Sequence, residues 1–274
     1  MTRPRAGFPT RRLALTGLAA SAALGAAGCS SATEVTASEA SAAGSSTTPT
    51  AVSAAPLTPT PTPSPTGPPS VATTPGPDLT HATTGRAEVA LTFHGAGDSA
   101  IADAVLGILA EHTAFMTVFA IGQWVQANPD LIRAIAAAGH EVGNHTWSHP
   151  DLPTMEEAAV RDEIRRGREA LAAVLGEPGW WFRPSATQTS TETIRAAARA
   201  EGYAVCVSYG VDPEDFRDPG ADLVRSRTQA AIQPGAIVSL HLGHPGTVEA
   251  LPGILEDLAV VSLAPVTLTA LVRS

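Results

Sequence analysis

Two histidines four residues apart, His145 and His149, are the first residues in this sequence whose type and spacing could do chemistry. Neutral imidazoles are common ligands of Zn²⁺. On a helical turn, a spacing of four residues puts both rings on one side, where they can share a divalent metal. Taken alone, the pair is also typical of two surface histidines. Its place in the fold, and the residues that meet it there, decide between these interpretations.

Strands and helices alternate along residues 85–274. Apolar runs predict strands at 88–93, 115–120, 141–145, 180–183, 203–209, 236–241 and 265–268. Segments with one apolar face predict helices at 99–111, 129–138, 155–175, 191–200, 221–232 and 247–258. This alternation indicates a mostly parallel sheet with helical crossovers. A full eight-fold barrel needs roughly 250 residues, so we expect an α/β fold of the distorted, contracted (β/α) barrel type with about seven strands.

Polar or ionisable side chains follow five of these strands. They are His94 and Asp98; His145 and His149; Arg183; Asp212 and Asp215; and His241. In barrels of this class the chemistry lies at the carboxyl ends of the strands. We therefore expect these side chains to meet on one rim of the barrel. The charged residues within 162–168 are expected to form a solvated face of a helix.

Four of these segments resemble motifs of the polysaccharide deacetylase family, the NodB-homology domains of carbohydrate esterase family 4. They are residues 139–149, 182–184, 211–216 and 237–241, which resemble the second to fifth motifs in that order. Phe216 stands where the fourth motif usually has tryptophan, and Ser239 where the fifth usually has leucine. The similarity spans about residues 86–274, the whole part of the chain that looks globular.

The resemblance implies a NodB-like barrel that removes acetyl groups from sugars with one divalent metal ion, for which zinc is the expected identity. Such a metal polarises the acetyl carbonyl and binds the attacking water. By position, His241 resembles the acid that protonates the leaving amine, and Asp212 or Asp215 would keep it oriented. Arg183 resembles the residue that pairs with the catalytic base. The expected substrate is an N-acetylated cell-envelope or extracellular glycan.

The first motif departs from the family pattern. The family has Thr-Phe-Asp-Asp-Gly, with a base followed by a metal ligand, whereas this chain has Thr-Phe-His-Gly-Ala at residues 92–96. The next carboxylate is Asp98, after a spacer with two glycines that could turn it back toward the site. In one interpretation His94 is the base and Asp98 joins His145 and His149 as a metal ligand. In a second, His94 is the third ligand and Asp98 the base. In a third, catalysis is lost and the domain only binds carbohydrate.

Substrate contacts are assigned to Trp181 and Leu240. A tryptophan can stack on a sugar face, but a large aromatic residue beside a short strand is also typical of a core position. Both interpretations of Trp181 stay open on the sequence alone.

The first 28 residues resemble a secretory signal: a basic head, a short apolar run and small residues before Cys29. That ending resembles a bacterial lipobox, which predicts lipidation of Cys29 and attachment to the outer face of the cell membrane. Residues 10–13 also resemble a twin-arginine export signal. Residues 29–84 are rich in Ser, Thr, Ala and Pro and predict a disordered tether, followed by a catalytic domain at 85–274.

The charge of the chain bears on its partners. It contains 17 arginines and no lysine against 26 acidic residues, for a formal net charge of −9. A basic footprint for nucleic acid is absent, so we expect none as a partner. A neutral or cationic substrate such as a glycan is easier to accommodate.

Overall fold

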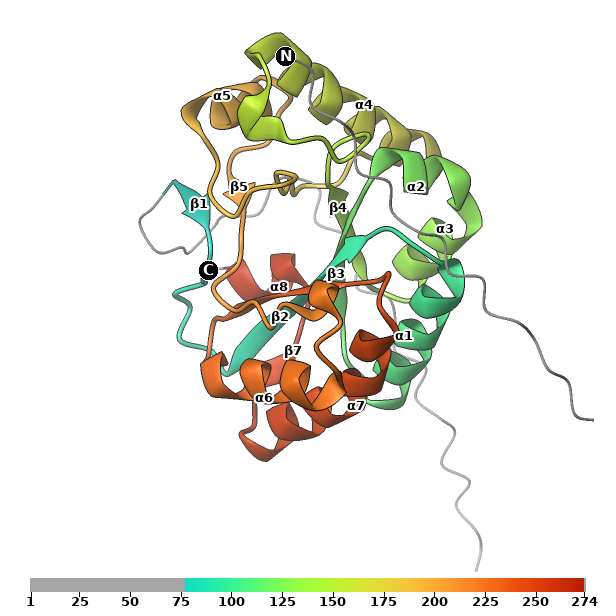
Figure 1. Ribbon diagram of the computed structural model, residues 1–274, viewed down its shortest axis with the longest axis vertical. Helices are drawn as coiled ribbons and strands as arrows, with labels where there is room; N and C mark the ends of the chain where they lie inside the picture. Colours follow the sequence, from blue (N-terminus) through green and yellow to red (C-terminus); the bar gives the residue numbers. More distant parts are fainter. Residues whose placement is uncertain (1–76, 274) are drawn as a thin grey trace, which may run out of the picture. The chain divides into compact units, whose positions relative to one another are not determined.

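The computed structural model describes residues 77–273, in which a parallel sheet is surrounded by helices (Figure 1). The strands are β1 (Asp78–Leu79), β2 (Glu88–Gly95), β3 (Met116–Ala120), β4 (Glu141–Asn144), β5 (Cys206–Val207), β6 (Ile237–His241) and β7 (Ala264–Pro265). The main sheet has the order β4-β3-β2-β6, β7 also pairs with β2, and all of these pairings are parallel. The expected α/β class with a parallel sheet is confirmed.

Single bridges continue the sheet into a distorted barrel. Phe182 bridges Asn144 at the end of β4 and Cys206 in β5, and β5 pairs with β1. An antiparallel bridge from His81 to Ala236 then brings the chain after β1 back to the start of β6. The contraction expected from the chain length thus takes the form of strands reduced to one or two residues.

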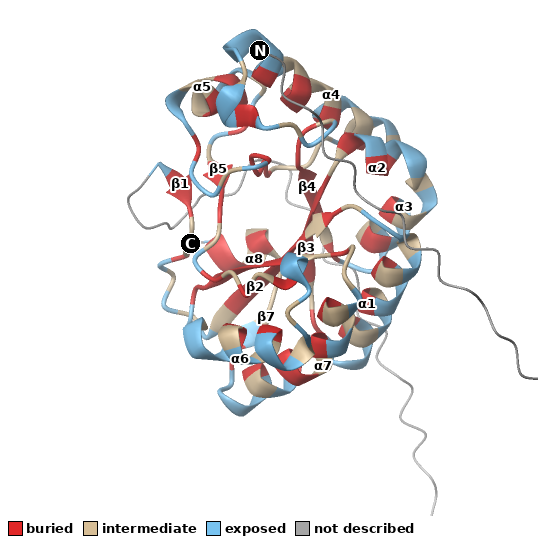
Figure 2. Cartoon of the chain, viewed as in Figure 1, coloured by how far each residue is buried: buried red, intermediate tan, exposed pale blue. Residues whose placement is uncertain are grey.

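The helices lie outside the strands and turn their buried faces toward them (Figure 2). They are α1 (Ser99–Glu111), α2 (Gly122–Ala127), α3 (Pro129–Ala137), α4 (Glu157–Leu175), α5 (Glu192–Ala200), α6 (Ala221–Ala231), α7 (Pro245–Val260) and α8 (Leu268–Val272), with 3₁₀ turns at Leu152–Thr154 and Asp215–Arg217. None of the helices within residues 77–273 combines the length and apolar character that a membrane span requires.

Three details differ from the elements expected. Helix α2 was not predicted, because its six residues are too short to show a helical period. The expected strands at 180–183 and 203–209 shrink to the Phe182 bridges and to β5. The last expected strand, 265–268, ends at Pro265, and the Thr267 hydroxyl then caps α8 by accepting from the amide of Ala270.

The folded part begins before the expected boundary at residue 84, which is a correction. Asp78 and Leu79 are buried and pair in register with Cys206 and Val207. The amide of Ser190 donates to Asp78 Oδ2 at 2.7 Å. The boundary was misplaced because a two-residue strand after a Pro-rich stretch carries no periodic signal of its own. The expected signal, Cys29 and the tether up to residue 76 lie outside the described residues.

The buried strands align the residues of interest. Residues 89–93 of β2 are all fully buried, as expected for a strand covered on both faces. In the parallel register, His94 of β2 lies beside His241 of β6, and Ala120 of β3 lies beside Asn144 of β4. The carboxyl ends of these strands therefore meet at one edge of the sheet.

Candidate active site

Three imidazoles from two strand ends form one group at this edge. His94 comes from β2, and His145 and His149 follow β4; each offers a nitrogen, and the three nitrogens lie within 4.8 Å of one another. His94 Nδ1 and His145 Nε2 are 3.0 Å apart. His145 is buried and His149 is exposed at the mouth, so the group is open to solvent on one side.

The loop from His145 to His149 is not the helical turn that the spacing suggested. Thr146 and His149 both have positive φ, at 68° and 60°. Asn144 Oδ1 accepts from the Thr146 amide at 3.0 Å, and Thr146 Oγ1 accepts from the His149 amide at 3.1 Å. Two left-handed residues held by short side chains therefore bring the two rings together, with centroids 4.9 Å apart.

Helix α4 fixes this loop through Glu163. Its Oε2 accepts from the amides of Trp147 and Ser148 at 3.0 and 2.8 Å, and its Oε1 accepts from the Ser148 hydroxyl at 2.9 Å. The expectation that 162–168 is a solvated face is wrong at Glu163, which is buried. A signal existed in the sequence: Glu163 lies three residues after Val160 and four before Gly167, on the buried stripe of the helix.

His145 is oriented by the backbone of the neighbouring segment. Its Nδ1 lies 2.8 Å from the carbonyl oxygen of Arg183. A carbonyl only accepts, so Nδ1 carries the proton and Nε2 presents its lone pair toward His94 and His149. A metal-binding histidine typically has this arrangement.

Arg183 lies under the group as a buried cation without a carboxylate partner among residues 77–273. Its guanidinium donates to Thr92 Oγ1 at 2.8 Å and to the Ser208 carbonyl at 3.0 Å, and its Nη1 lies 3.2 Å from His94 Nε2. Its Nε has no hydrogen-bond partner. Burial lowers the pKa of Arg183 to about 9, which still leaves it charged at neutral pH.

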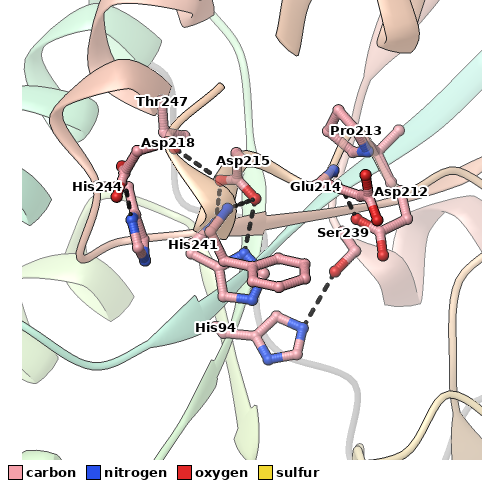
Figure 3. Close-up of polar contacts among 12 residues, drawn as sticks. His94, Asp212, Pro213, Glu214, Asp215, Asp218, Ser239, His241, His244 and Thr247 are labelled. Atoms are coloured by element: carbon pink, nitrogen blue, oxygen red, sulfur yellow. Dashed lines mark hydrogen bonds and ion pairs between the residues drawn. The ribbon is translucent and has the colours of Figure 1, made fainter. Parts of the chain in front are cut away.

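His241 and Asp215 form a tight pair beside His94 (Figure 3). His241 Nδ1 lies 2.7 Å from Asp215 Oδ1, and Oδ2 accepts from the His241 amide at 2.7 Å and from the Thr247 hydroxyl at 2.6 Å. The His241 ring stacks on that of His94, with centroids 4.3 Å apart. Of the two aspartates expected to orient His241, Asp215 makes the contact, whereas Asp212 accepts from the amide of Glu214 at 2.9 Å.

Asp98 is not brought to the imidazoles, which corrects both roles expected of it. Its carboxylate accepts from the amide of Ala100 at 3.0 Å and caps α1. Asp98 is exposed and lies outside the three-histidine group. The spacer does turn tightly, since Gly97 has φ of +93° and a Cβ there would lie 2.7 Å from the Cα of Gly243. The turn places Asp98 at the N-cap of α1, where its carboxylate accepts a hydrogen bond from an otherwise unpaired amide of the first helical turn.

Trp181 and Leu240 are also not where a sugar could reach them. Trp181 is 2% exposed, and its indole donates at 2.9 Å to both Glu141 Oε1 and the Thr269 hydroxyl. Leu240 is fully buried in the main apolar core. Both substrate assignments are therefore corrected: these side chains are structural.

The electrostatics of the site favour neutral imidazoles. Burial, followed by the neighbouring histidines and Arg183, holds the pKa values of His94 and His145 well below the usual range. Partial burial also lowers the pKa of His149. Neutral imidazole is the form that binds a metal, and three such nitrogens match the donor set of catalytic zinc sites. The side chains of His94, His145 and His149 thus fit one divalent ion.

Sequence reasoning gave no role to several residues that border the site. The Arg183 guanidinium carbon lies over the Tyr209 ring, 5.4 Å from the ring centroid. The centroids of the Tyr209 and His94 rings are 6.5 Å apart. Ser239 Oγ lies 3.2 Å from His94 Nε2. Tyr209 ends an expected strand and Ser239 breaks the fifth motif, so both positions carried a signal, whereas nothing in the sequence marks the Thr247 contact.

Comparisons with known proteins agree with this architecture. The profile of the polysaccharide deacetylase family matches residues 81–206. The chain is 38% identical over 161 residues to a chitooligosaccharide deacetylase of Bradyrhizobium sp. (strain ANU 289), covering 59% of this chain and 73% of that one. Among solved structures, a peptidoglycan N-acetylglucosamine deacetylase superposes with a TM-score of 0.66 at 28% identity, over 71% of this chain and 92% of the other. A structure described as a CE4 family pseudoenzyme from Bacillus anthracis superposes with a TM-score of 0.67 at 26% identity, over 72% and 69% of the two chains.

Proposed function

The chain belongs to the polysaccharide deacetylase family, which includes hydrolases of carbon–nitrogen bonds other than peptide bonds. From this premise we propose that it removes acetyl groups from an N-acetylated glycan in a metal-dependent reaction. One observation carries the proposal: three neutral imidazoles converge on a point beside the His241–Asp215 pair. A metal-binding group and a proton-transfer group on one open rim are what amide hydrolysis requires.

We propose that His94, His145 and His149 hold one divalent ion, and that the ion is zinc. A zinc ion there would polarise the acetyl carbonyl and lower the pKa of a bound water. This assignment gives His94 the ligand role and leaves the carboxylate of Asp98 outside the chemistry. The orientation of His145 by the Arg183 carbonyl supports it, because the free Nε2 faces the other two rings.

His241 is the residue that moves the proton in this proposal. Asp215 holds Nδ1, so Nε2 is free to take a proton from the attacking water and to deliver it to the nitrogen of the leaving amine. Asp215 also stabilises the imidazolium that exists between these two steps. Arg183 supports the site by placing a buried positive charge beside His94, which keeps that imidazole neutral and able to bind a metal.

The names of two relatives support a proposal for the substrate class. One acts on chitooligosaccharides and another on peptidoglycan N-acetylglucosamine, by their names. We propose that this chain acts on a glycan that contains N-acetylglucosamine. The acidic chain, with a net charge of −9, suits a neutral substrate and a cationic amine product.

Acetate release from N-acetylated chitooligosaccharides and from peptidoglycan tests this function. Zinc-loaded wild type should release acetate, and chelation should abolish the release. Asp215→Asn should keep zinc but lose about 10²- to 10⁴-fold in rate, the usual share of acid–base catalysis. His145→Ala should lose both zinc and activity. Zinc-bound wild type that releases no acetate from either substrate would refute the deacetylase proposal.

A second function, glycan binding without catalysis, has an observation of its own in favour. No carboxylate hydrogen-bonds to Arg183 or to the three histidines within residues 77–273, so the site lacks a carboxylate base. A similar structure is described as a pseudoenzyme. Calorimetric binding of an N-acetylated oligosaccharide with no acetate released over hours would favour this second function.

For the location of the protein, we propose attachment to the outer face of the cell membrane through a lipid on Cys29. The small residues before Cys29 and the Pro-rich stretch after it support this. Cys29→Ser should move the protein from the membrane fraction to the soluble fraction, as judged by immunoblot. Wild type that is already soluble outside the cell would contradict the anchor.

A further inference from the structure

Two residues that depart from the family pattern meet in the site. His94 stands where the first motif has an aspartate, and Ser239 stands where the fifth usually has a leucine. Ser239 lies in β6 opposite Thr92, two residues before His94 along β2. Its Oγ is 3.2 Å from His94 Nε2 and has no other hydrogen-bond partner within residues 77–273 (Figure 3). The serine is 1% exposed, so water does not compete for this contact.

His94 Nε2 has two neighbours of different chemistry. Arg183 approaches it at 3.2 Å and can only donate. Ser239 approaches at the same distance and can donate or accept. A neutral imidazole carries one proton, on either Nδ1 or Nε2. If the proton is on Nε2, Arg183 cannot receive it and Ser239 Oγ is the acceptor in contact.

The other ring nitrogen of His94, Nδ1, faces the proposed metal ligands His145 and His149. His94 Nδ1 lies 3.0 Å from His145 Nε2. His145 Nε2 carries a lone pair and no proton, because the proton of that ring is on Nδ1, which donates to the Arg183 carbonyl. With the His94 proton on Nδ1, the two rings satisfy each other and neither can take a metal. With the proton on Nε2, both lone pairs point into the group.

We infer that Ser239 is a positioning residue that makes His94 a metal ligand, by accepting the Nε2 proton and freeing the Nδ1 lone pair. The inference rests on the proposed three-histidine site and assigns a cause to it. An aliphatic side chain at this position would leave a buried N–H facing a guanidinium, with no acceptor. The two departures from the family pattern therefore compensate each other: a histidine at 94 needs a hydroxyl at 239.

Zinc affinity of the purified full chain tests this without reference to activity. Ser239→Ala should bind zinc about 10- to 100-fold more weakly than wild type, the usual effect of losing a hydrogen bond to a ligating histidine. It should also shift the visible spectrum of the cobalt-substituted protein. Ser239→Thr, which keeps the hydroxyl, should restore both. Thr228→Val is the matched control, because it removes a buried hydroxyl that bonds only to the Val224 carbonyl in α6.

Nitrogen-15 NMR of the histidine side chains tests the same inference in the wild-type protein, so this measurement does not depend on whether a variant folds. In zinc-loaded wild type, His94 should carry its proton on Nε2; a proton on Nδ1 would overturn the inference. The inference would also be overturned if Ser239→Ala bound zinc as tightly as wild type while His145→Ala bound it weakly. In that case the proposed metal site would stand and only the role of Ser239 would fail. If wild type itself binds no zinc, the proposed function fails, and the role of Ser239 fails with it.

Discussion

At the scale of single residues, the site is organised around a buried charge. Arg183 is 1% exposed, and its partners are neutral: two oxygens and the His94 ring. A buried cation of this kind holds nearby imidazoles neutral, because a second positive charge beside it is costly. The same residue supplies the carbonyl that orients His145. Arg183 therefore prepares two of the three candidate ligands, one through its guanidinium and one through its backbone.

The residues His94 and Asp98 should respond in opposite ways to truncation. His94→Ala should lose most of its zinc affinity, since it removes one of three nitrogens. Asp98→Ala should keep zinc and lose about 1 kcal/mol of stability, the usual cost of an N-cap. Zinc titration and urea unfolding measure the two effects. If Asp98→Ala loses zinc and His94→Ala keeps it, the three-histidine assignment is wrong.

At the scale of elements, helix α4 supports the loop that carries His145 and His149. Glu163 binds two amides of the loop, and the side chain of Asn144 donates to the Ile164 carbonyl at 2.8 Å. Gly167 lets the helix come close enough, because a Cβ there would collide with Asn144 Oδ1 and lie 2.8 Å from the Thr146 oxygen. The helix and the loop thus touch backbone to backbone.

Gly167→Ala should therefore damage the site from a distance. The added methyl group must push α4 away from the loop, so both the melting temperature and the zinc affinity should fall. Gly107→Ala in α1 is the control, since nothing lies within 4 Å of its added Cβ. That change should stabilise the protein by about 0.5–1 kcal/mol, the ordinary gain from replacing glycine within a helix. Equal behaviour of the two variants would show that the close approach does not matter.

At the scale of the whole molecule, the barrel is closed by residues that precede its first long strand. Leu79 is 1% exposed and Ala82 is 2% exposed, and the Ala82 amide donates to the Gly235 carbonyl at 2.9 Å. These contacts join the β5 side of the barrel to β6. They give residues 77–84 a structural role that their composition does not suggest.

A chain that starts at residue 85 should consequently be less stable than one that starts at residue 77. The loss should be at least that of a buried leucine, about 2–5 kcal/mol, because the deletion also opens the pairing of β1 with β5. Urea unfolding of the two chains, followed by circular dichroism, measures the difference. Identical midpoints would mean that residues 77–84 contribute nothing to the fold.

The stability of the whole domain should also depend on pH through His140. Burial lowers the pKa of His140 to about 4, against an ordinary value of 6.5 in the unfolded chain. Between these values the unfolded chain binds a proton that the folded chain does not. Stability should therefore fall as the pH falls from about 6.5 to 4, with up to about 1.4 kcal/mol per pH unit from this group.

His140→Asn isolates this contribution. The asparagine oxygen can replace Nδ1 as acceptor of the Met116 amide but cannot titrate. The neighbouring Glu141 has a pKa raised by burial and acts in the opposite direction, but it is present in both proteins. In metal-free protein, the variant should lose less stability than wild type between pH 6.5 and 4. Parallel pH profiles would contradict the assignment.

The sequence by itself determined the alternation of strands and helices, the parallel sheet and the rim on which His94, His145, Arg183 and His241 meet. These follow from local patterns: apolar runs that make buried strands, and polar residues directly after them. Parallel strands bring such residues to one edge whatever the details of packing. The position of the candidate site at this edge is therefore encoded in local sequence patterns.

Only the tertiary structure decided which residues do what at that rim. Asp98 caps a helix, Asp215 and not Asp212 holds His241, and Glu163 is buried under the loop. Trp181 and Leu240 belong to the core, and β1 belongs to the barrel. Each of these outcomes depends on a contact between segments far apart in the chain, or on a backbone turn of one or two residues. Periodicity carries no information about either, because hydrogen-bond partners and burial are set by what packs against a residue and not by its neighbours in sequence.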